Sequence, residues 1–236
     1  MSALPSQDPK IALCLGYVGM VYEYKEDFAR ALDYYHRQLE MEEQCLPIEH
    51  PHLSLHLEKT AKTYKKKEEN GEKALQFCQE KLAAQNSILP KHHPRITSTL
   101  ITLGDISVGK ERREYYEQAL AALQSLVPSD ELLTLTCLEK LAAVAHDEGN
   151  GLESIAHWTT ILNTRRRIHY PDHTKIAYSL QCIGDVCFEL LGNYPEACRC
   201  CEESLDIYHA NFGPEHRDVI EVEAKLYKAQ AQSREW

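Results

Sequence analysis

Five cysteines lie close together towards the end of the chain, and thiolates are the side chains that most readily hold zinc or change redox state. They are Cys182, Cys187, Cys198, Cys200 and Cys201. A structural zinc site needs about four ligands that converge tetrahedrally, usually from two Cys-x-x-Cys pairs. The cluster lacks a second pair, and small thiols often fill helical cores. We therefore expect core cysteines, with no metal site and no cofactor. A cysteine-based metal or redox sensor is the less favoured alternative.

Other residue types that carry catalysis do not form a recognisable pattern. The twelve histidines are scattered, and four of them lie beside recurring prolines. The sequence contains no Ser/His/Asp order, no glycine-rich phosphate loop and no His-Glu-x-x-His motif. Paired carboxylates such as Glu42-Glu43 are typical of a solvated helix face. We therefore expect a protein that is not an enzyme.

The densest run of charge is basic and lies within an acidic chain. It consists of Lys62, Lys65, Lys66 and Lys67, with Lys59 just before. One interpretation is a solvated helix end, because positive charge is favoured at a helix C-terminus. The other is a site for acidic side chains of a partner, because like charges three or four residues apart repel each other. The sequence leaves both interpretations open.

Composition narrows the classes of partner. The 236 residues include 26 Lys and Arg and 36 Asp and Glu, which gives a net charge of −10. An acidic chain argues against nucleic-acid binding, which requires a clustered basic face. No apolar run approaches the roughly 18 residues of a membrane span. The segment Met1–Asp8 has neither the basic region nor the apolar core of a secretory signal. With nine cysteines read as reduced thiols, we expect a cytoplasmic protein.

A proline with a nearby histidine recurs along the chain. It occurs at Pro47–Pro51, Pro90–Pro94, Pro171–His173 and Pro214–His216. His50 and His93 are 43 residues apart, and so are His173 and His216. A fixed period of this size is the signature of a repeat array. Such an array presents one long surface, which favours a binding protein over an enzyme.

Each repeat contains two stretches with helical periodicity. The first carries a leucine and, four residues later, a small residue, and the second begins about twelve residues further on. The pairs are Leu15 and Gly19, Leu57 and Ala61, Leu100 and Gly104, Leu138 and Ala142, and Leu180 and Gly184. A small residue indicates a close helix crossing. We therefore expect larger side chains at Gly104 or Gly184 to overpack the interface.

The third repeat departs from this spacing. Ala119 and Ala142 are 23 residues apart, whereas the equivalent residues of other repeats are separated by 30. We expect a short second helix, about two turns shorter than in the other repeats, that ends near Pro128. We also expect a longer loop at Gly109–Tyr115.

The leucine, the small residue, a following tyrosine and the later alanine together resemble the tetratricopeptide repeat. The period of 42–43 residues and the joint Gly213–Val219 are similar to the repeats of kinesin light chains. The resemblance covers about residues 8–220. It implies an all-α fold, an α-α superhelix or solenoid of five helical hairpins with a C-terminal capping helix.

The resemblance predicts a single repeat domain over residues 1–236. Its repeats would span about residues 8–50, 51–93, 94–129, 130–172 and 173–215. The capping helix would span about 216–234, because Glu223 and Tyr227 replace the leucine and the small residue there. The run Arg165–Arg167 falls near the end of a second helix, so we expect it on the outer, solvated face.

In this family the first helix of each repeat lines a concave groove that holds peptides. The resemblance therefore implies a peptide-binding groove on these helices. Its apolar residues would be Leu13, Met20, Tyr24, Leu55, Ile101, Val108, Tyr178 and Phe188. Its polar residues would be Lys62, Lys65, Lys66, Asp105, Gln181 and Asp185.

The favoured hypothesis is a non-enzymatic interaction scaffold that binds a protein or peptide, including one with an acidic segment. The runner-up is a cargo adaptor of a microtubule motor. That role needs a motor-binding segment, and the sequence shows no heptad region of the expected kind.

Overall fold

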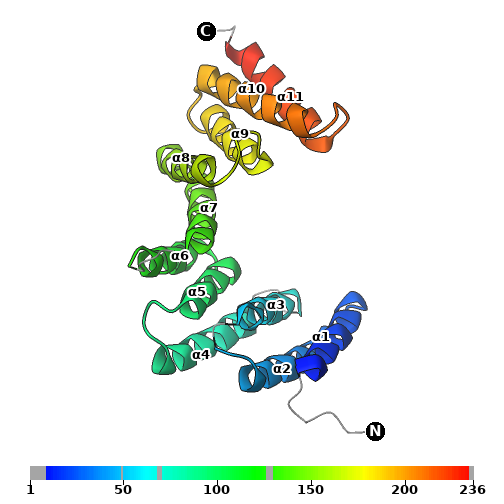
Figure 1. Cartoon of the computed structure of the whole chain (residues 1–236). Coiled ribbons are helices and arrows are strands. Elements are labelled where there is room, and N and C mark those ends of the chain that lie inside the picture. Colours follow the sequence, from blue (N-terminus) through cyan, green and yellow to red (C-terminus); the bar gives the residue numbers. More distant parts are fainter. Residues whose placement is uncertain (1–8, 49, 68–70, 126–129, 234–236) are drawn as a thin grey trace. The chain divides into compact units, whose positions relative to one another are not determined.

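The fold consists of helices throughout the part of the chain that a computed structural model describes, residues 9–48, 50–67, 71–125 and 130–233 (Figure 1). Within these ranges there are eleven α-helices and no strand. They are α1 Pro9–Tyr24, α2 Phe28–Cys45, α3 Pro51–Lys67, α4 Glu72–Ile88, α5 Pro94–Ile106, α6 Gly109–Gln124, α7 Glu131–Asp147, α8 Gly151–Ile168, α9 Thr174–Glu189, α10 Tyr194–Asn211 and α11 Arg217–Ser233. None of them combines the length and the apolar character needed to cross a lipid bilayer.

The helices belong to two compact bodies. The N-terminal body extends to Thr134 and contains α1 to α6, and the C-terminal body begins at Leu135 and contains most of α7 and all of α8 to α11. Each predicted repeat holds one pair of consecutive helices, and α11 follows as the predicted extra helix. The all-α fold of paired helices is therefore confirmed. A single domain formed by all five repeats stays a prediction.

Glycine allows the two helices of a pair to approach closely in two hairpins. The ring of Tyr35 lies over Gly19, and the ring of Tyr116 lies over Gly104, so that a Cβ atom at either glycine would overlap the ring. Each tyrosine hydroxyl then donates a hydrogen bond to a carboxylate on the glycine's own helix. The acceptors are Glu23 at 2.7 Å and Asp105 at 2.6 Å, respectively.

Gly184 does not follow this pattern. A Cβ atom there would lie 3.4 Å from Sγ of Cys201 and 3.5 Å from the carbonyl oxygen of Ala197, which are ordinary contact distances. A Cβ atom would therefore overlap a neighbour at Gly104, as predicted, whereas at Gly184 the backbone of α10 lies close but a Cβ atom fits. Cysteine takes the place of a tyrosine ring in this hairpin, and the smaller side chain leaves space.

Within each body, successive hairpins are joined by one recurring polar contact. A residue near the end of a second helix bonds to the residue fourteen positions later, in the first helix of the next hairpin. The pairs are Glu42 with His56 at 2.6 Å, Gln85 with Thr99 at 2.9 Å and Arg165 with Ser179 at 2.7 Å. Because these groups are largely withdrawn from water, losing one partner would leave the other unsatisfied. Glu42 is 4% exposed, so the solvated position expected for the Glu42-Glu43 pair is wrong for Glu42.

The recurring joint histidines cap helices. Nδ1 of His93 accepts a hydrogen bond from the backbone N–H of Arg95 at 3.1 Å, and Nδ1 of His173 accepts one from Lys175 at 3.1 Å. Each contact satisfies an N–H that has no partner within its helix. Pro94 occupies the first position of α5, where a missing N–H costs nothing.

The third hairpin differs from the prediction in how it is shortened. Helix α6 ends at Gln124, five residues after Ala119, whereas α2, α4, α8 and α10 continue fourteen residues beyond the equivalent position. The early end is confirmed, although residues 126–129, where the stop was placed, lie outside the described residues. The prediction of a second helix about two turns shorter is wrong, because α6 has 16 residues and the other second helices have 17 or 18. The predicted loop at Gly109–Tyr115 is wrong, because α6 already begins at Gly109. The helix has moved towards its N-terminus.

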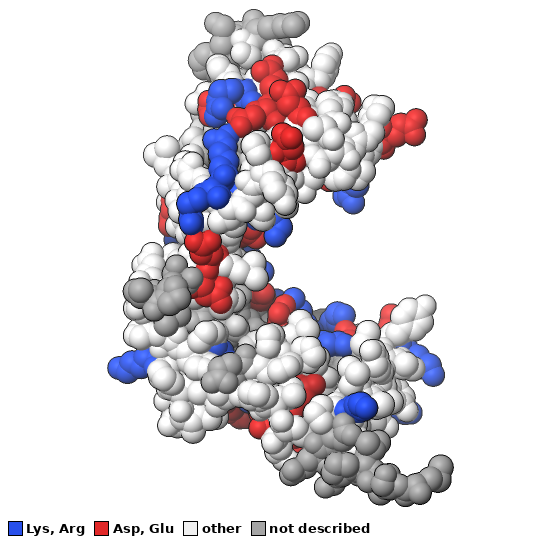
Figure 2. All heavy atoms as spheres, in the orientation of Figure 1, with Lys and Arg blue, Asp and Glu red and all other residues white. Residues whose placement is uncertain are grey.

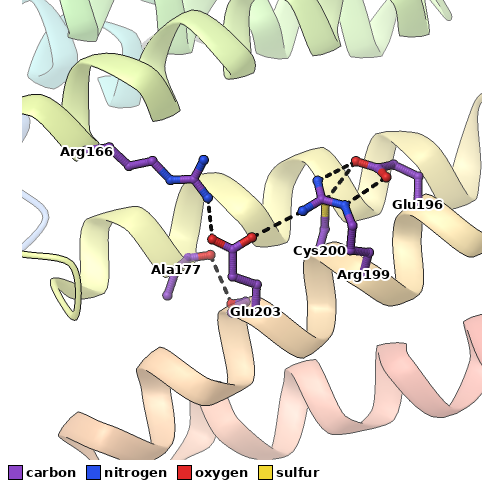
Figure 3. Close-up of polar contacts among 7 residues, drawn as sticks. Arg166, Ala177, Glu196, Arg199, Cys200 and Glu203 are labelled. Atoms are coloured by element: carbon purple, nitrogen blue, oxygen red, sulfur yellow. Dashed lines mark hydrogen bonds and ion pairs between the residues drawn. The ribbon is translucent and has the colours of Figure 1, made fainter.

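The arginine run also differs from its prediction in part. Arg166 is exposed and pairs with Glu203, which bonds in turn to Arg199 at 3.3 Å (Figure 3). Figure 2 shows a line of basic atoms beside acidic ones on this side of the C-terminal body. Arg165, however, is 6% exposed and donates hydrogen bonds to Ser179 and to the carbonyl oxygen of Lys175. The prediction of an outer, solvated position is therefore wrong for Arg165.

Most of the clustered cysteines are core residues, as predicted. Cys187, Cys200 and Cys201 are at most 3% exposed, and burial raises their thiol pKa values to about 11, about 12 and about 11. Cys182 and Cys198 are only partly buried. Among the described residues, no group of three or more His, Cys, Asp or Glu side chains is placed to hold a metal ion.

Replacing Gly104 and Gly184 with alanine should have opposite effects. We expect Gly104→Ala to destabilise by about 1–3 kcal/mol, because the buried Tyr116 ring is held by Asp105 and cannot move aside. Gly184→Ala should be neutral or stabilising by up to about 1 kcal/mol, because alanine favours helix and has room. Thermal unfolding followed by circular dichroism measures both. Equal melting temperatures for the two variants would contradict the packing described here.

The thiols should react in an order set by burial. We expect Cys14, which is exposed, to react rapidly with a thiol reagent, while Cys187, Cys200 and Cys201 react only after unfolding. A high thiol pKa leaves little of the reactive thiolate at neutral pH. Mass spectrometry of labelled peptides identifies each site. A chelator should leave the helical signal unchanged. Loss of that signal would reveal structural zinc, because its binding contributes folding energy directly.

Candidate functional site

The C-terminal body carries a pocket between the first helices of two successive hairpins. Ala142, Ala143, His146 and Asp147 of α7 line one side, and Cys182, Asp185, Val186 and Glu189 of α9 line the other. Trp158 of α8 also contributes to its wall. The volume is about 230 Å³. We call it the α7–α9 pocket.

A second pocket lies on the other side of α9. Gly184, Phe188, Ala197, Cys201 and Ala229 supply its apolar wall. The same pocket is lined by the charged residues Asp185, Glu189, Lys225 and Lys228, and its volume is about 120 Å³. We call it the α9–α11 pocket. It exists because the glycine and the cysteine leave the space that a tyrosine ring fills in other hairpins.

Carboxylates lie at both pockets. Burial raises the pKa of Asp185 above its ordinary value, although Nζ of Lys225 donates to it at 2.9 Å. The same ammonium lies 2.9 Å from Glu221, and this contact lowers the pKa of Glu221. Nε2 of His146 lies 3.1 Å from Glu189 across the α7–α9 pocket. The two pockets therefore combine small apolar surfaces with ionisable groups.

The predicted groove residues of α9 lie beside these pockets, with one exception. The ring of Tyr178 is 47% exposed and packs edge-on against Trp158, with ring centres 5.8 Å apart. Asp185 and Phe188 line pockets directly. Gln181 is only 9% exposed and donates to Glu221 at 2.9 Å, so it joins α9 to α11 and offers little surface to a ligand.

The predicted apolar groove residues of α1 and α3 are exposed. On α1, Leu13 and Met20 are each nearly half exposed, and Tyr24 is 92% exposed. On α3, Leu55 is 55% exposed. These side chains are accessible, and two pockets of this body are lined by other residues, such as Leu53 and Leu100.

Each of the three predicted groove lysines has a partner within the protein. Lys62 pairs with Glu58 on its own helix. Nζ of Lys66 lies 2.7 Å from Glu23 of α1, and Nζ of Lys65 donates to the carbonyl oxygen of Asp105 of α5 at 3.1 Å. The lysines therefore help to link three first helices.

The lysine run also ends a helix. Lys65, Lys66 and Lys67 form the last turn of α3, where the helix dipole favours positive charge. The side chains of Lys62 and Lys66 stay more than half exposed, and basic atoms gather near α3 in Figure 2. This position agrees with the solvated-helix interpretation and leaves the charge accessible to a partner.

Two predicted groove residues lie elsewhere. Ile101 is 8% exposed and belongs to the core, because α5 packs between its neighbours over nearly its whole surface. Val108 lies beyond the end of α5, at the residue before α6, although it is 78% exposed. Asp105 is partly buried, and its carboxylate accepts a hydrogen bond from the hydroxyl of Tyr116.

Sequence reasoning missed several pocket residues. Ala143, His146 and Asp147 occupy the same register in α7 as predicted groove residues in other hairpins, so the repeat spacing contained the signal. The repeat spacing gave no signal for the pocket residues of α11, which are Lys225, Lys228 and Ala229. That helix lacks the leucine and the small residue by which the other first helices are aligned.

Comparison with protein families and solved structures agrees with this architecture. Tetratricopeptide repeat models match residues 190–218 and residues 18–48. No curated protein matches the chain in sequence. Among solved structures, the TPR-like repeats of a kinesin light chain protein from Podosopora anserina share 16% identity, with a TM-score of 0.65. That match covers 87% of this chain and 99% of the other.

Two further structures resemble the chain at similar levels. BtubC (BKLC) from P. vanneervenii has 17% identity and a TM-score of 0.68, over 89% of this chain and 85% of that one. A STAND protein with a tetratricopeptide repeat sensor, from Pyrococcus horikoshii, has 15% identity and a TM-score of 0.63, over 98% of this chain and 38% of that one. The protein thus contains tetratricopeptide repeats, and it has the fold of the tetratricopeptide-type repeats solved for kinesin light chain proteins.

Proposed function

We propose that this chain is a non-enzymatic interaction protein that binds a peptide segment of a partner protein along the first helices of its hairpins. The observation that carries the proposal is the pair of pockets on either side of α9, both lined by residues of that helix. Apolar pockets with a few convergent polar groups are the usual form of a binding site.

The size of the pockets favours side chains over small molecules. Their volumes of about 230 Å³ and about 120 Å³ lie below the roughly 300–1,000 Å³ typical of small-molecule sites. Each can accept one apolar side chain of a peptide that crosses α9. Tyr178, beside Trp158, adds an exposed aromatic ring of the kind enriched at binding hot spots.

The charges indicate which peptides fit best at these pockets. Asp147, Asp185 and Glu189 provide carboxylates, while Lys225 already bonds to Asp185 and Glu221. A peptide with apolar anchors next to hydrogen-bond donors or a basic residue would be complementary. The exposed lysines of α3 favour an acidic stretch at a separate place in the N-terminal body.

The alternatives have less support. The likeness to kinesin light chain repeats concerns the fold, and the motor-adaptor role has no further observation in its favour. The sensor role depends on the cysteines, most of which are buried with raised pKa values. The cytoplasmic location stays a prediction.

Blocking the α7–α9 pocket should weaken peptide binding. Random peptides displayed on phage would be selected on the purified chain, and the affinity of enriched peptides measured by fluorescence anisotropy. Ala143→Trp places a large ring at an exposed, pocket-lining position, so we expect the Kd to rise by about tenfold or more, equivalent to about 1.4 kcal/mol.

The matched control is Ala156→Trp, which adds the same ring at an exposed position of α8 away from both pockets. It should leave the Kd unchanged. The proposal would be wrong if no peptide were enriched, or if the two tryptophan variants bound equally well. Circular dichroism of both variants checks that the fold is intact.

Acidic peptides from the same selection test the lysines of α3. Converting Lys62, Lys65 and Lys66 together to Glu should raise their Kd by about tenfold, mainly by slowing association. Conversion to Gln should have a smaller effect. Raising salt from about 0.1 M to about 1 M should mimic the charge reversal, because the screening length falls from about 10 Å to about 3 Å. If neither the charge reversal nor the added salt altered the Kd of the acidic peptides, their binding site would lie elsewhere.

A further inference from the structure

The N-terminal body has a pocket where the ends of α2 and α4 meet the starts of α3 and α5. Its volume is about 250 Å³, and we call it the α2–α4 pocket. Apolar side chains supply more than half of its lining residues, and they are Leu46, Ile48, Leu53, Ala84 and Ile88. Its polar lining residues are Glu43, Lys81, Gln85 and Arg95.

Arg95 is a buried cation that lacks a hydrogen-bonded partner. The residue is 8% exposed, and its Nε–H donates to no group in the described part of the chain. The carboxylate of Glu43 lies 3.7 Å from Nη2 of Arg95, which is longer than a hydrogen bond. Burial lowers the pKa of Arg95, and Glu43 opposes that effect. A buried charge without hydrogen-bonded partners is costly, so Arg95 would gain from an added acceptor.

Arg165 shows how the same side chain is satisfied elsewhere in this protein. It is 6% exposed, and its Nε also has no partner in the described structure. Its terminal nitrogens, however, donate to Ser179, to the carbonyl oxygen of Lys175 and to Glu139. The guanidinium of Arg165 is therefore held inside the protein. That of Arg95 makes no such bonds and lines a pocket.

The repeat architecture does not require a buried cation at this position. Arg95 follows a joint histidine by two residues and donates its backbone N–H to that histidine, as do His52, Lys175 and Asp218 in other hairpins. His52 and Lys175 are exposed, and Asp218 is partly buried. The burial of Arg95 is therefore a property of the α2–α4 pocket and not of the shared fold.

The charges of the pocket leave room for one carboxylate. Nζ of Lys81 already lies 2.8 Å and 3.0 Å from the two carboxylate oxygens of Glu43. With Arg95 included, the described lining residues carry two positive charges and one negative charge. A single carboxylate balances this sum, and it can accept two parallel hydrogen bonds from a guanidinium. A doubly charged phosphate would leave excess negative charge beside Glu43.

We propose that the α2–α4 pocket binds an acidic side chain from a segment of a partner protein, with an apolar side chain of that segment packed on Ile88. The volume of about 250 Å³ lies below the roughly 300–1,000 Å³ of small-molecule sites, which favours a single side chain as the occupant. Ile88 is 69% exposed and offers the apolar surface. The site is separate from the pockets beside α9 and does not depend on them.

NMR of the full chain with isotope-labelled arginine tests the proposal at the residue itself. The side-chain Nε–H signal of Arg95 is the one that disappears in Arg95→Lys. The probe is acetyl-Glu-Leu-amide, titrated into the millimolar range, and acetyl-Gln-Leu-amide is its neutral isostere. We expect the Arg95 signal to shift with the first dipeptide only. Acetate should bind more weakly, because it carries the charge without the leucine.

Two variants should change the affinity in opposite directions. Ile88→Glu places a negative charge at an exposed, pocket-lining position, so it should raise the Kd of acetyl-Glu-Leu-amide by about threefold or more. Glu43→Gln removes the negative charge near Arg95 and should lower the Kd by about threefold or more. The matched control is Ile168→Glu, the same change at the last residue of α8, as Ile88 is the last residue of α4. It should leave the Kd unchanged.

Several results would overturn the proposal. One is an Arg95 signal that responds to neither dipeptide, or equally to both. Another is acetate binding as tightly as acetyl-Glu-Leu-amide, which would mean a site for small anions only. Equal Kd values for Ile88→Glu and Ile168→Glu, or weaker binding by Glu43→Gln, would also overturn it. Circular dichroism checks that each variant keeps its fold.

Discussion

Each body depends on the contact that joins one of its hairpins to the next. A second helix meets the following first helix through a polar pair fourteen residues apart, as with Glu42 and His56 or Arg165 and Ser179. A repeat array has few long-range contacts, so its order must be maintained by neighbours alone. These pairs fix the rotation of one helix against the next, because a buried polar group loses its partner if the register slips. The positions of first-helix side chains, and hence the pockets beside α9, follow from them.

Much of the fold could be predicted from spacing. Leucine and a small residue four positions apart identified the first helices, and the joint histidines marked where hairpins begin. The side chain of His93 caps α5 at the start of such a hairpin. The start of α6 could not be predicted. Residues 109–114 consist of a glycine and five charged residues, a composition that is typical of a loop. In the protein that segment is helical, and Tyr116, in its second turn, fills the space over Gly104.

The candidate site was less predictable, because it depends on how individual side chains pack. Groove positions carried over from a regular repeat assume regular packing, and Ile101 is buried because α5 is short and enclosed. Arg165 sits in a run of three arginines that looks solvated, yet its guanidinium bonds to Ser179 in the next hairpin. The α9–α11 pocket depends on a cysteine where another hairpin has tyrosine. That difference is visible in the sequence, but the void that it leaves is visible only in three dimensions.

The joints also differ from one another in chemistry. The first pairs a carboxylate with an imidazole, the second an amide with a hydroxyl, and another a guanidinium with a hydroxyl. A hairpin moved to a different place in the chain would therefore meet the wrong partner. Glu42 opposite Thr99, for example, would bury a carboxylate without the imidazole beside it. The repeats share one architecture but are not interchangeable modules. Recombination within such a gene would be tolerated only where it carries both halves of a joint together.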